Sequence, residues 1–552
     1  MAPMLELPAG QDNPPDNSFD VAIVGAGFAG LYMLHCLREH GFRAIVLEAG
    51  GGVGGTWYWN RYPGARCDIP SIEYSYSFSP ELEKEWRWSE RYAAQPEILA
   101  YLDHVADRFD LRRDIRLNTR VEAAIWQEEP QSWEVRIAGD APIEARFVVL
   151  ATGNLSTPKL PDWPGMADFR GEVLHTAMWP EGADLAGKRV GVVGTGSSGI
   201  QAIPQLAAVA EQLTIFQRTP SFIVPASNAP LGDEEIAAIQ PDLPGLRAEA
   251  RMSALGFFQK PIGAGTAKGA SPEERAQVFE ESWLSGPAGL LSAFGDLLFD
   301  IESNDHAANY ARQKFAELIH DPETARRVTP QGYPIGARRL VSEIGYFDAL
   351  NRPNVELIDV REEPIAAITE HGVRTPEREI PIDALVLATG FHAMTGAAAA
   401  IDIVGTDGRT LRDEWADGPR AYLGLGVAGF PNLFFVTGPG SPSVLSNVVL
   451  SIEQHVEWLT DLFDAMRRDG ATRIEVEEDA EAAWMTEVDT IAQQTLFPRA
   501  NSWYHSRTRD GRTVFMPYVG GVGAYRARCD QIARDGYPGF RLTSLPIESQ
   551  AA

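Results

Sequence analysis

The sequence predicts an α/β fold made of two strand–turn–helix units and a helical insertion. An apolar strand at residues 20–24 leads into the glycine-rich turn 25–30 and then into a helix. A second apolar strand, at 189–193, leads into a similar turn at 194–199 and another helix. Both units have the length and glycine spacing of Rossmann-like dinucleotide-binding domains. Residues 226–330 are rich in Ala, Glu, Leu and Gln with few strand signals, which predicts the insertion.

The composition narrows the class of protein. The 552 residues are 44% hydrophobic and 22% charged, as expected for a folded chain of several domains. A net charge of -28 argues against nucleic acid as a partner. No apolar run is long enough to span a membrane, and no signal peptide is recognisable. The three cysteines form no C-x-x-C pair or metal motif, so we expect no metal and a reduced, cytoplasmic protein.

The first glycine-rich turn has the features of an adenine dinucleotide site. Its glycines allow a tight turn, close approach of a pyrophosphate and close helix–strand packing, while the helix N-terminus faces the phosphates. Glu48, at the end of the next strand, suits a ribose diol and repels a 2′-phosphate, which favours FAD or NAD. The alternative is a glycine turn in an ordinary α/β domain. The predicted contacts are Gly25, Gly27, Phe28, Ala29, Gly30 and Glu48.

The second turn, residues 194–199, differs from the first in the charge of the residues at the end of the strand that follows it. The position that corresponds to Glu48 is Gln217, and Arg218 and Thr219 follow it. A neutral residue beside a cation and a hydroxyl suits a 2′-phosphate and predicts NADP(H), unless Arg218 is only a solvated charge at a strand end. The predicted contacts in and after the turn are Thr195, Gly196, Ser197, Ser198, Gly199 and Gln201.

Two such sites in one chain indicate a flavoenzyme that NADPH reduces. A disulfide reductase would share this layout, but it would need a redox cysteine pair that this chain lacks. Apolar strands at 147–153 and 386–390 both end in Ala-Thr-Gly. We therefore expect a flexible tail (1–18), a discontinuous FAD domain (19–153 and 386–552), a discontinuous NADP domain (154–225 and 331–385) and the helical insertion (226–330).

The string F-R-G-E-V-L-H-T-A-M-W-P at residues 169–180 carries a family resemblance. It resembles the signature of the type I Baeyer–Villiger monooxygenases, through Phe169, Gly171, His175 and Trp179. Related N-hydroxylating and flavin-containing monooxygenases usually lack this Trp. Further similar segments lie at 54–68, 194–201, 388–391 and 438–442, and the chain looks closest to the phenylacetone and steroid monooxygenase branch.

The resemblance implies that NADPH and O2 are used to insert oxygen beside a ketone carbonyl through a C4a-peroxyflavin, giving an ester or a lactone. Flavin-dependent N- or S-oxygenation is the alternative. The partners implied are a ketone and O2, with no membrane and no nucleic acid, in a monomer or small homo-oligomer. The resemblance also implies that the 169–180 string is a linker that couples domain movement, with no direct part in the chemistry.

The same resemblance implies a catalytic pair. Arg339 matches the family's Arg that stabilises negative charge on the reacting oxygen, and Asp68 matches the acid that orients this Arg. Arg338 stands where the family usually has a Lys on the NADP 2′-phosphate. Taken alone, the two arginines could be a solvated basic pair, and Asp68 could be an N-cap.

The remaining assignments are also carried over from the family. Trp503 matches a Trp on the NADP ribose but could be a plain core aromatic, since the sequence after it departs from the family. Residues 438–448 are expected to approach the flavin, with backbone amides donating to it. The further expected contacts are Thr56, Trp57, Tyr74, Val121 and Val448 for FAD, and Arg66 on the nicotinamide side.

Overall fold

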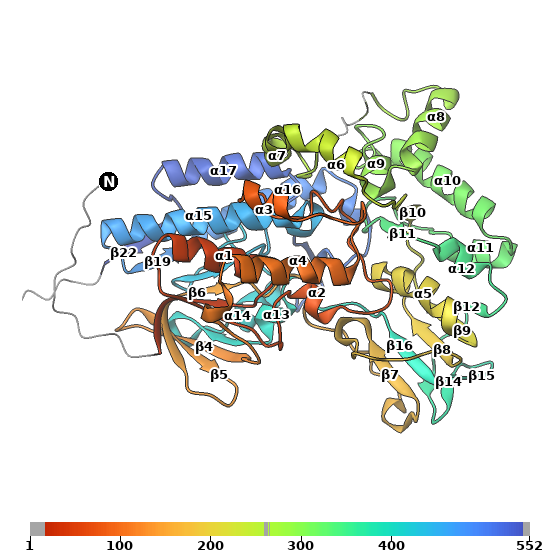
Figure 1. Ribbon diagram of the computed structural model, residues 1–552, viewed down its shortest axis with the longest axis horizontal. Helices are drawn as coiled ribbons and strands as arrows, with labels where there is room; N and C mark the ends of the chain where they lie inside the picture. The colour runs from red at the N-terminus through yellow and green to blue at the C-terminus, as the bar shows by residue number, and fades with distance from the viewer. Residues whose placement is uncertain (1–16, 259–262, 264, 545–552) are drawn as a thin grey trace, which may run out of the picture.

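The computed structural model describes residues 17–258, 263 and 265–544 (Figure 1). The expected N-terminal tail lies almost wholly outside this part of the chain. The first strand, β1 (Ser18–Val24), already begins at the end of that tail. No helix of the described residues is long and apolar enough to cross a membrane.

The larger sheet has eight strands in the order β17-β4-β5-β6-β1-β2-β3, with β18 also paired to β6. Strands β6, β1, β2, β3 and β18 are parallel neighbours, whereas β4, β5 and β6 form an antiparallel meander. Alternate residues of β1 face the two sides, so Val21 and Ile23 pack under helices α1 (Phe28–Glu39) and α15 (Val448–Asp469). The other strand bounds are β2 (Ala44–Leu47), β3 (Ile115–Arg116), β4 (Val121–Gln127), β5 (Ser132–Ile137), β6 (Ile143–Leu150), β17 (Asp402–Val404) and β18 (Leu433–Phe435).

The second sheet has five strands, all parallel, in the order β12-β9-β8-β16-β7. Helices α5 (Ser197–Val209) and α12 (Tyr346–Leu350) share an apolar core with one of its faces. A small antiparallel sheet, β13-β14-β15, covers the other face. The bounds are β7 (Glu172–His175), β8 (Arg189–Val193), β9 (Gln212–Gln217), β12 (Val355–Asp359), β13 (Ala367–Ile368), β14 (Gly372–Arg374), β15 (Glu379–Pro381) and β16 (Ala384–Leu387).

Two expectations about chain organisation change here. The 169–180 string is no free linker, because its residues Glu172–His175 form β7, the edge strand paired in parallel with β16. Strand β16 itself belongs to the second sheet, so the chain returns to the first sheet only after Leu387 and not from residue 386. The apolar run at 384–387 could not distinguish the two sheets, since a buried parallel strand reads alike in both.

Each sheet with the helices packed on it forms one part of the molecule, and we call these parts the first body (eight-stranded sheet) and the second body (five-stranded sheet). The helices of the insertion divide between them. Helix α7 packs its Ala250 against Leu450 of α15 and Val522 of α17 (Val522–Arg534). The later helices instead contribute Phe279 and Phe315 to the core of the second sheet. Figure 1 shows α7 beside α17, with α8 to α11 on the side of the second sheet. The bounds are α6 (Asp233–Ile239), α7 (Leu243–Met252), α8 (Pro272–Trp283), α9 (Gly286–Leu291), α10 (Ile301–Leu318) and α11 (Pro322–Val328).

The remaining elements lie mainly around the first sheet. They are α2 (Thr56–Trp59), α3 (Pro80–Glu85), α4 (Gln95–Arg108), α13 (Gly396–Ala399), α14 (Leu411–Glu414), α16 (Glu478–Gln493), and the short paired strands β10 (Ile223–Pro225) with β11 (Val341–Glu343), β19 (Arg473–Val476) with β22 (Phe540–Thr543), and β20 (His505–Arg507) with β21 (Thr513–Phe515).

Candidate active site

One cavity of about 860 Å³ is lined by strand ends of the first sheet and by the start of helix α5, which packs on the second sheet. It lies at the carboxyl ends of the first sheet's parallel strands, where open α/β sheets bind ligands. Most of the expected site residues line it, namely Gly25, Gly27, Phe28, Ala29, Glu48, Thr56, Trp57, Arg66, Asp68, Tyr74, Val121, Ser197, Ser198, Gln201, Arg339, Val448 and Trp503. The expected residues outside its lining are Gly30, Thr195, Gly196, Gly199, Arg218, Thr219, Arg338, Phe169, Gly171, His175 and Trp179.

Two helices begin next to this cavity with open N-termini. Helix α1 starts after Gly27 and α5 after Gly196; within the described residues neither has a side-chain cap, and neither has an acid in its first turn. Other helices of this chain do carry such caps, for example Ser79 on α3 and Asp300 on α10. The free N–H groups and the positive end of the helix dipole at each site suit a phosphate anion.

The first and last glycines of the first turn are required by close backbone contacts. A Cβ added at Gly25 would lie 2.7 Å from the carbonyl oxygen of Ala151, and one at Gly30 would lie 1.8 Å from that of Gly25. Gly27 faces Gly55 across the cavity wall, with an added Cβ 3.4 Å from the Cα of Gly55. The turn therefore leaves a narrow backbone cradle at the start of α1.

Glu48 is buried beside this cradle. Its Oε2 accepts a hydrogen bond from the amide of Ala26 and its Oε1 from that of Gly50, both at 2.7 Å. Each carboxylate oxygen has a second lone pair, so Glu48 can shape the turn and still accept from a diol.

An aromatic cluster forms another part of the wall. The indole N–H of Trp57 donates to the hydroxyl of Tyr74 over 3.2 Å, and the ring of Phe28 packs edge-on against Tyr74 at 5.2 Å. All three side chains are buried, and burial raises the pKa of Tyr74 far above its ordinary value. The cluster offers a flat, apolar surface that carries no charge at neutral pH.

Asp68 and Arg339 meet in the cavity although 271 positions separate them in the chain. The guanidinium donates from Nε to Oδ2 at 3.0 Å and from Nη2 to Oδ1 at 2.6 Å, and its Nη1 donates to the carbonyl of Val444 at 3.0 Å. The Asp68 carboxylate raises the pKa of Arg339, so the cation is permanent. Arg339 is therefore paired and not merely solvated, and Asp68 is no N-cap because no helix begins directly after it.

The expected NADP residues cluster at the carboxyl ends of β8 and β9. The hydroxyl of Thr195 donates to the carbonyl of Thr219 at 3.4 Å, and the hydroxyl of Tyr333 donates to that of Pro220 at 2.7 Å. Arg338 lies over the ring of Tyr333, 5.3 Å from its centroid, and Arg218 is exposed nearby in sequence. The hydrogen bonds thus connect the segment that bears Arg338 to the one that bears Arg218.

Gln201 of α5 joins the two bodies across the cavity. Its Oε1 accepts from the hydroxyl of Tyr62 at 2.7 Å and from the amide of Arg66 at 3.3 Å, and its Nε2 donates to the carbonyl of Arg66 at 3.0 Å. The guanidinium of Arg66 is itself paired with Glu90. A side chain from the second body therefore holds a loop of the first.

His175 and Trp179 are both buried away from the Asp68–Arg339 pair. The Nδ1 of His175 accepts from the amide of Ala177 at 3.0 Å, and its Nε2 lies 3.3 Å from the hydroxyl of Thr389. Burial lowers the pKa of His175, which keeps the imidazole neutral. Its partners on both sides indicate a structural role, while Ala177 of the same string does line the cavity.

The expectation that the 438–441 turn donates backbone amides to a ligand is wrong. The amide of Gly438 donates to Gly424, that of Gly440 to Met516 and that of Ser441 to Gly438, so all three are already engaged. The turn is buried under neighbouring segments instead. Val444, Ser446 and Val448, further along, do reach the cavity.

The sequence interpretation missed two residues at the cavity, one behind Arg339 and one in the wall. Tyr504, next to Trp503, is buried and lies close enough to Arg339 for the guanidinium to lower the tyrosine's pKa, although burial raises that pKa overall to about 12. Thr437 lines the cavity with a left-handed backbone, and its amide donates to Nδ1 of the buried His455 at 2.9 Å. No local motif marks either contact, because each joins distant segments.

The described residues contain no group of three or more His, Cys, Asp or Glu side chains arranged to hold a metal ion. The hydrogen-bond donors around the cavity, which are amides, hydroxyls and guanidinium groups, suit anionic organic ligands.

Comparisons with known proteins agree with this geometry. The family model for pyridine nucleotide-disulphide oxidoreductases matches residues 22–229. A solved structure of oxidised steroid monooxygenase bound to NADP is 50% identical, with a TM-score of 0.91, covering 96% of this chain and 100% of that one.

Curated relatives match over most of their length. A Baeyer–Villiger monooxygenase of Pseudooceanicola batsensis is 39% identical over 94% of this chain and 95% of its own. Cyclopentanone 1,2-monooxygenase of a Comamonas species is 38% identical over 99% and 100%, and phenazine N-monooxygenase PhzNO1 of Lysobacter antibioticus is 40% identical over 96% and 98%. The chain belongs to the Baeyer–Villiger monooxygenase family of flavoproteins.

Proposed function

We propose that this chain is an FAD- and NADPH-dependent monooxygenase that inserts one oxygen atom of O2 beside a ketone carbonyl, giving an ester or a lactone. The observation that carries the proposal is the Asp68–Arg339 pair on the wall of a cavity that two open helix N-termini also reach. The closely spaced cysteine pair that a disulfide reductase needs has no counterpart, since the three cysteines stand far apart at positions 36, 67 and 529.

The two nucleotide ends of the cavity fit different cofactors. The cradle before α1, with Glu48 and the Phe28–Trp57–Tyr74 cluster, would hold FAD, which when reduced by NADPH supplies the activated oxygen. The start of α5 would hold the NADPH phosphates, with Arg218, Thr219 and Arg338 at the 2′-phosphate and Arg66 and Trp503 nearer the nicotinamide and its ribose. Thr56, Val121 and Val448 would contact FAD.

Arg339 is the catalytic residue of the proposal. When oxygen bonds to the ketone carbon, negative charge develops on oxygen, and a fixed cation in a site shielded from water stabilises it. Asp68 holds the guanidinium by two hydrogen bonds and so fixes its direction. Removing one such charge stabiliser from an active site typically lowers the rate by about 100- to 1000-fold.

We further infer that the FAD domain comprises residues 19–153 and the chain beyond Leu387, and that the NADP domain lies between them without the inserted helices. A monomer or a small homo-oligomer is proposed. The three free thiols fit a reducing compartment, which supports the cytoplasm as its location.

Incubating the purified protein with a panel of ketones, NADPH and O2, followed by mass spectrometry, tests the reaction. We expect a product one oxygen heavier than the ketone that fragments as an ester or a lactone. Amines and sulfides belong in the same panel, because one relative is named an N-monooxygenase. Oxidised amine or sulfide without any ester would overturn the proposal in favour of the alternative.

The Arg339→Ala variant tests the catalytic assignment. NADPH should still reduce the bound flavin at close to the native rate, since that step does not need Arg339, whereas ester formation should be lost. Arg339→Lys keeps a cation but not the two-point pairing, so it should retain only a small part of the activity. Ester formation by Arg339→Ala at near-native rates would refute the role.

A further inference from the structure

Helix α7 carries a cation in the middle of its buried face. Leu243, Arg247 and Ala250 are its buried residues, at the i, i+4 and i+7 spacing of a core-facing stripe. The Arg247 residue is only 7% exposed. A buried charge is costly unless hydrogen bonds and an opposite charge compensate it, so the partners of Arg247 indicate what the residue does.

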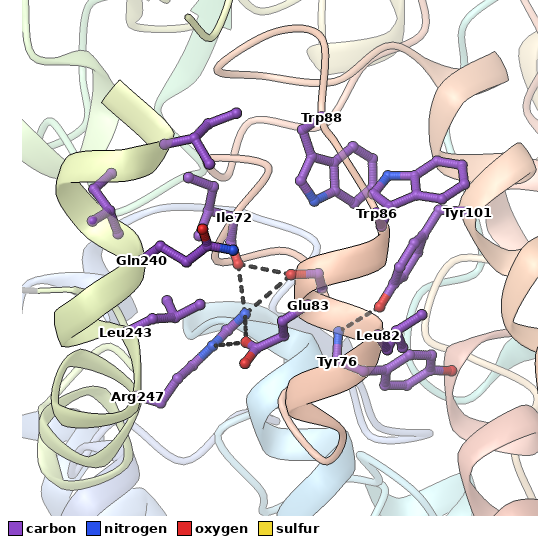
Figure 2. A pocket seen from close by; sticks show the side chains of 13 residues that line it. Ile72, Tyr76, Leu82, Glu83, Trp86, Trp88, Tyr101, Gln240, Leu243 and Arg247 are labelled. Carbon is purple, nitrogen blue, oxygen red and sulfur yellow. Dashed lines mark hydrogen bonds and ion pairs between the residues drawn. The ribbon is translucent and has the colours of Figure 1, made fainter. Parts of the chain in front are cut away.

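Figure 2 labels two of those partners, Ile72 and Glu83, beside Arg247. The guanidinium donates from Nε to Oε1 of Glu83 on α3 at 3.0 Å, from Nη2 to the carbonyl of Ile72 at 2.6 Å and to Oγ of Ser75 at 3.0 Å, and from Nη1 to the carbonyl of Glu73 at 3.4 Å. Three of these four acceptors belong to residues 72–75. Arg247 therefore holds one short turn of the first body, residues 72–75, through three hydrogen bonds.

The hollow beside Arg247 is too small to explain the buried cation by a ligand. It measures about 40 Å³ and is lined mainly by Trp86, Trp88, Tyr101 and aliphatic residues of α6 and α7. That volume holds about three water molecules, far less than a cofactor or a ketone of several carbons needs. The guanidinium is engaged by the turn and by Glu83.

The turn 72–75 stands directly behind two walls of the active-site cavity. Tyr74 lies within the turn and binds Trp57 through its hydroxyl. The carbonyl of Glu73 also accepts from Nδ2 of Asn447 at 2.8 Å, and Asn447 caps the N-terminus of α15 through the amide of Val449. The residues that flank Asn447, Ser446 and Val448, both line the cavity.

We propose that Arg247 is a positioning residue for the oxygenation reaction. By fixing residues 72–75, it sets the position of the Tyr74–Trp57 pair on the flavin side and, through Glu73 and Asn447, the start of α15 on the substrate side. The cation thereby keeps both walls closed against water without touching substrate or cofactor. This inference rests on the proposed function of the cavity.

The Arg247→Met and Arg247→Lys variants test it. Methionine keeps the stem but removes the cation, whereas lysine keeps the charge without the planar fork. Displaced walls should change the visible circular dichroism of bound FAD and lower the ester formed per NADPH oxidised, with hydrogen peroxide making up the difference. We expect ester yield to fall about tenfold in Arg247→Met, since sub-ångström misplacement of reacting groups costs about this much, and less in Arg247→Lys.

Arg473→Met is the matched control. Arg473 is also a largely buried arginine, paired with Glu475 and lying over Trp126, but outside the cavity lining. The Arg473→Met variant should lower thermal stability while leaving the flavin spectrum and the ester yield unchanged. NADPH reduction of the flavin should stay near native in every variant, because the α5 end of the cavity is not altered.

Native dichroism and native ester yield in Arg247→Met would overturn the inference. If that variant does not fold, Glu83→Gln and Ser75→Ala, which each remove one partner of Arg247, take its place, and a native spectrum and yield in both would overturn it equally. Failure of the proposed function is distinct, because it appears as the absence of ester from the native protein.

Discussion

At the scale of single residues, the two proposed nucleotide sites differ in the side chain at the end of the second strand and in the hydrogen bonds that it makes. Glu48 stands at the end of β2 and accepts two backbone amides, whereas its counterpart Gln217 at the end of β9 is buried and neutral. The Oε1 of Gln217 accepts from Thr195 and its Nε2 donates to the carbonyl of Arg327. Because Gln217 carries no negative charge, it does not repel a phosphate, and the neighbouring Arg218 can attract one.

Arg218→Ala should weaken NADPH binding selectively. A charge-assisted hydrogen bond is worth about 1.5–3 kcal/mol, so the KM for NADPH should rise by about tenfold or more. NADH has no 2′-phosphate, and its KM should hardly change. Steady-state kinetics with both coenzymes measures the difference, and an equal rise for NADH would remove the argument for a 2′-phosphate site.

Glu73 gives stability a dependence on pH. Burial raises the pKa of its carboxyl group from 4.5 to about 7, although the amide of Phe258 and the charge of Arg247 oppose the shift. The folded state therefore holds this proton more tightly than the unfolded state. The resulting stabilisation is complete below pH 4.5 and is lost as the pH rises to about 7, a change of about 3 kcal/mol at most.

Glu73→Gln mimics the protonated group at every pH. Thermal unfolding of the native protein and the variant between pH 5 and pH 8 should show the variant gaining relative stability as the pH rises. Other titrating groups affect both proteins alike and cancel in the difference. A constant difference across this range would contradict the assigned pKa shift.

At the scale of elements, local sequence predicted most strands and helices but not every partnership between them. The turns 25–30 and 194–199 were recognisable because the first and last of their three spaced glycines stand where an added Cβ would meet backbone atoms at less than 3 Å. Residues 172–175 gave no such signal: the exposed Glu172 and Val173 precede the buried Leu174 and His175, as suits an edge strand or a linker. Only the register with β16, set by long-range contacts, decides between them.

The Asp68–Arg339 pair illustrates the same limit at the site. Either residue alone has an ordinary surface interpretation, and only the family resemblance connected them. Tyr504 had no such support. Its contact with Arg339 arises from the folding of the C-terminal segment over the cavity, which no periodicity or spacing records.

Gly171→Ala should loosen the β7 edge. An added Cβ would lie 2.4 Å from the carbonyl oxygen of Asp383, which also accepts the first bond from the amide of Glu172, and 2.4 Å from the ring of Phe169. Overpacking of this kind costs about 1–3 kcal/mol, measurable as a lower denaturation midpoint. The native protein is the reference, and a native denaturation midpoint in Gly171→Ala would contradict the steric argument.

At the scale of the whole molecule, the two sheets are joined by side chains that cross the cavity and by an insertion divided between them. The sequence predicted one helical unit at 226–330, because helix propensity does not tell which neighbour an apolar face will meet. In the structure, α7 stabilises the first body and α8 to α11 the second. Polar contacts such as those of Gln201, together with the packing of Tyr62 and Ala65 in the second core, connect the two bodies.

Gln201→Leu should increase the mobility of the loop 62–66, which Gln201 holds by hydrogen bonds. Its contacts with Tyr62 and Arg66 comprise three hydrogen bonds, each worth about 0.5–1.5 kcal/mol. Hydrogen exchange at the amide of Arg66 should accelerate by about tenfold or more, whereas Gln205→Leu, one turn along α5 and exposed, should leave it unchanged. Unchanged exchange in Gln201→Leu would show that other contacts hold the loop.

Binding of the proposed cofactors in the cavity of about 860 Å³ would link the stability of the fold to cofactor supply. A ligand that binds only the native state adds about 2.7 kcal/mol to the free energy of unfolding at a hundredfold excess over its Kd, a large share of the 5–15 kcal/mol typical of a protein. Two nucleotides that fill the space between the bodies act additively in this respect. A cell short of flavin would then contain less of this enzyme as well as less of its activity, because the cofactor-free chain unfolds more often and is degraded sooner.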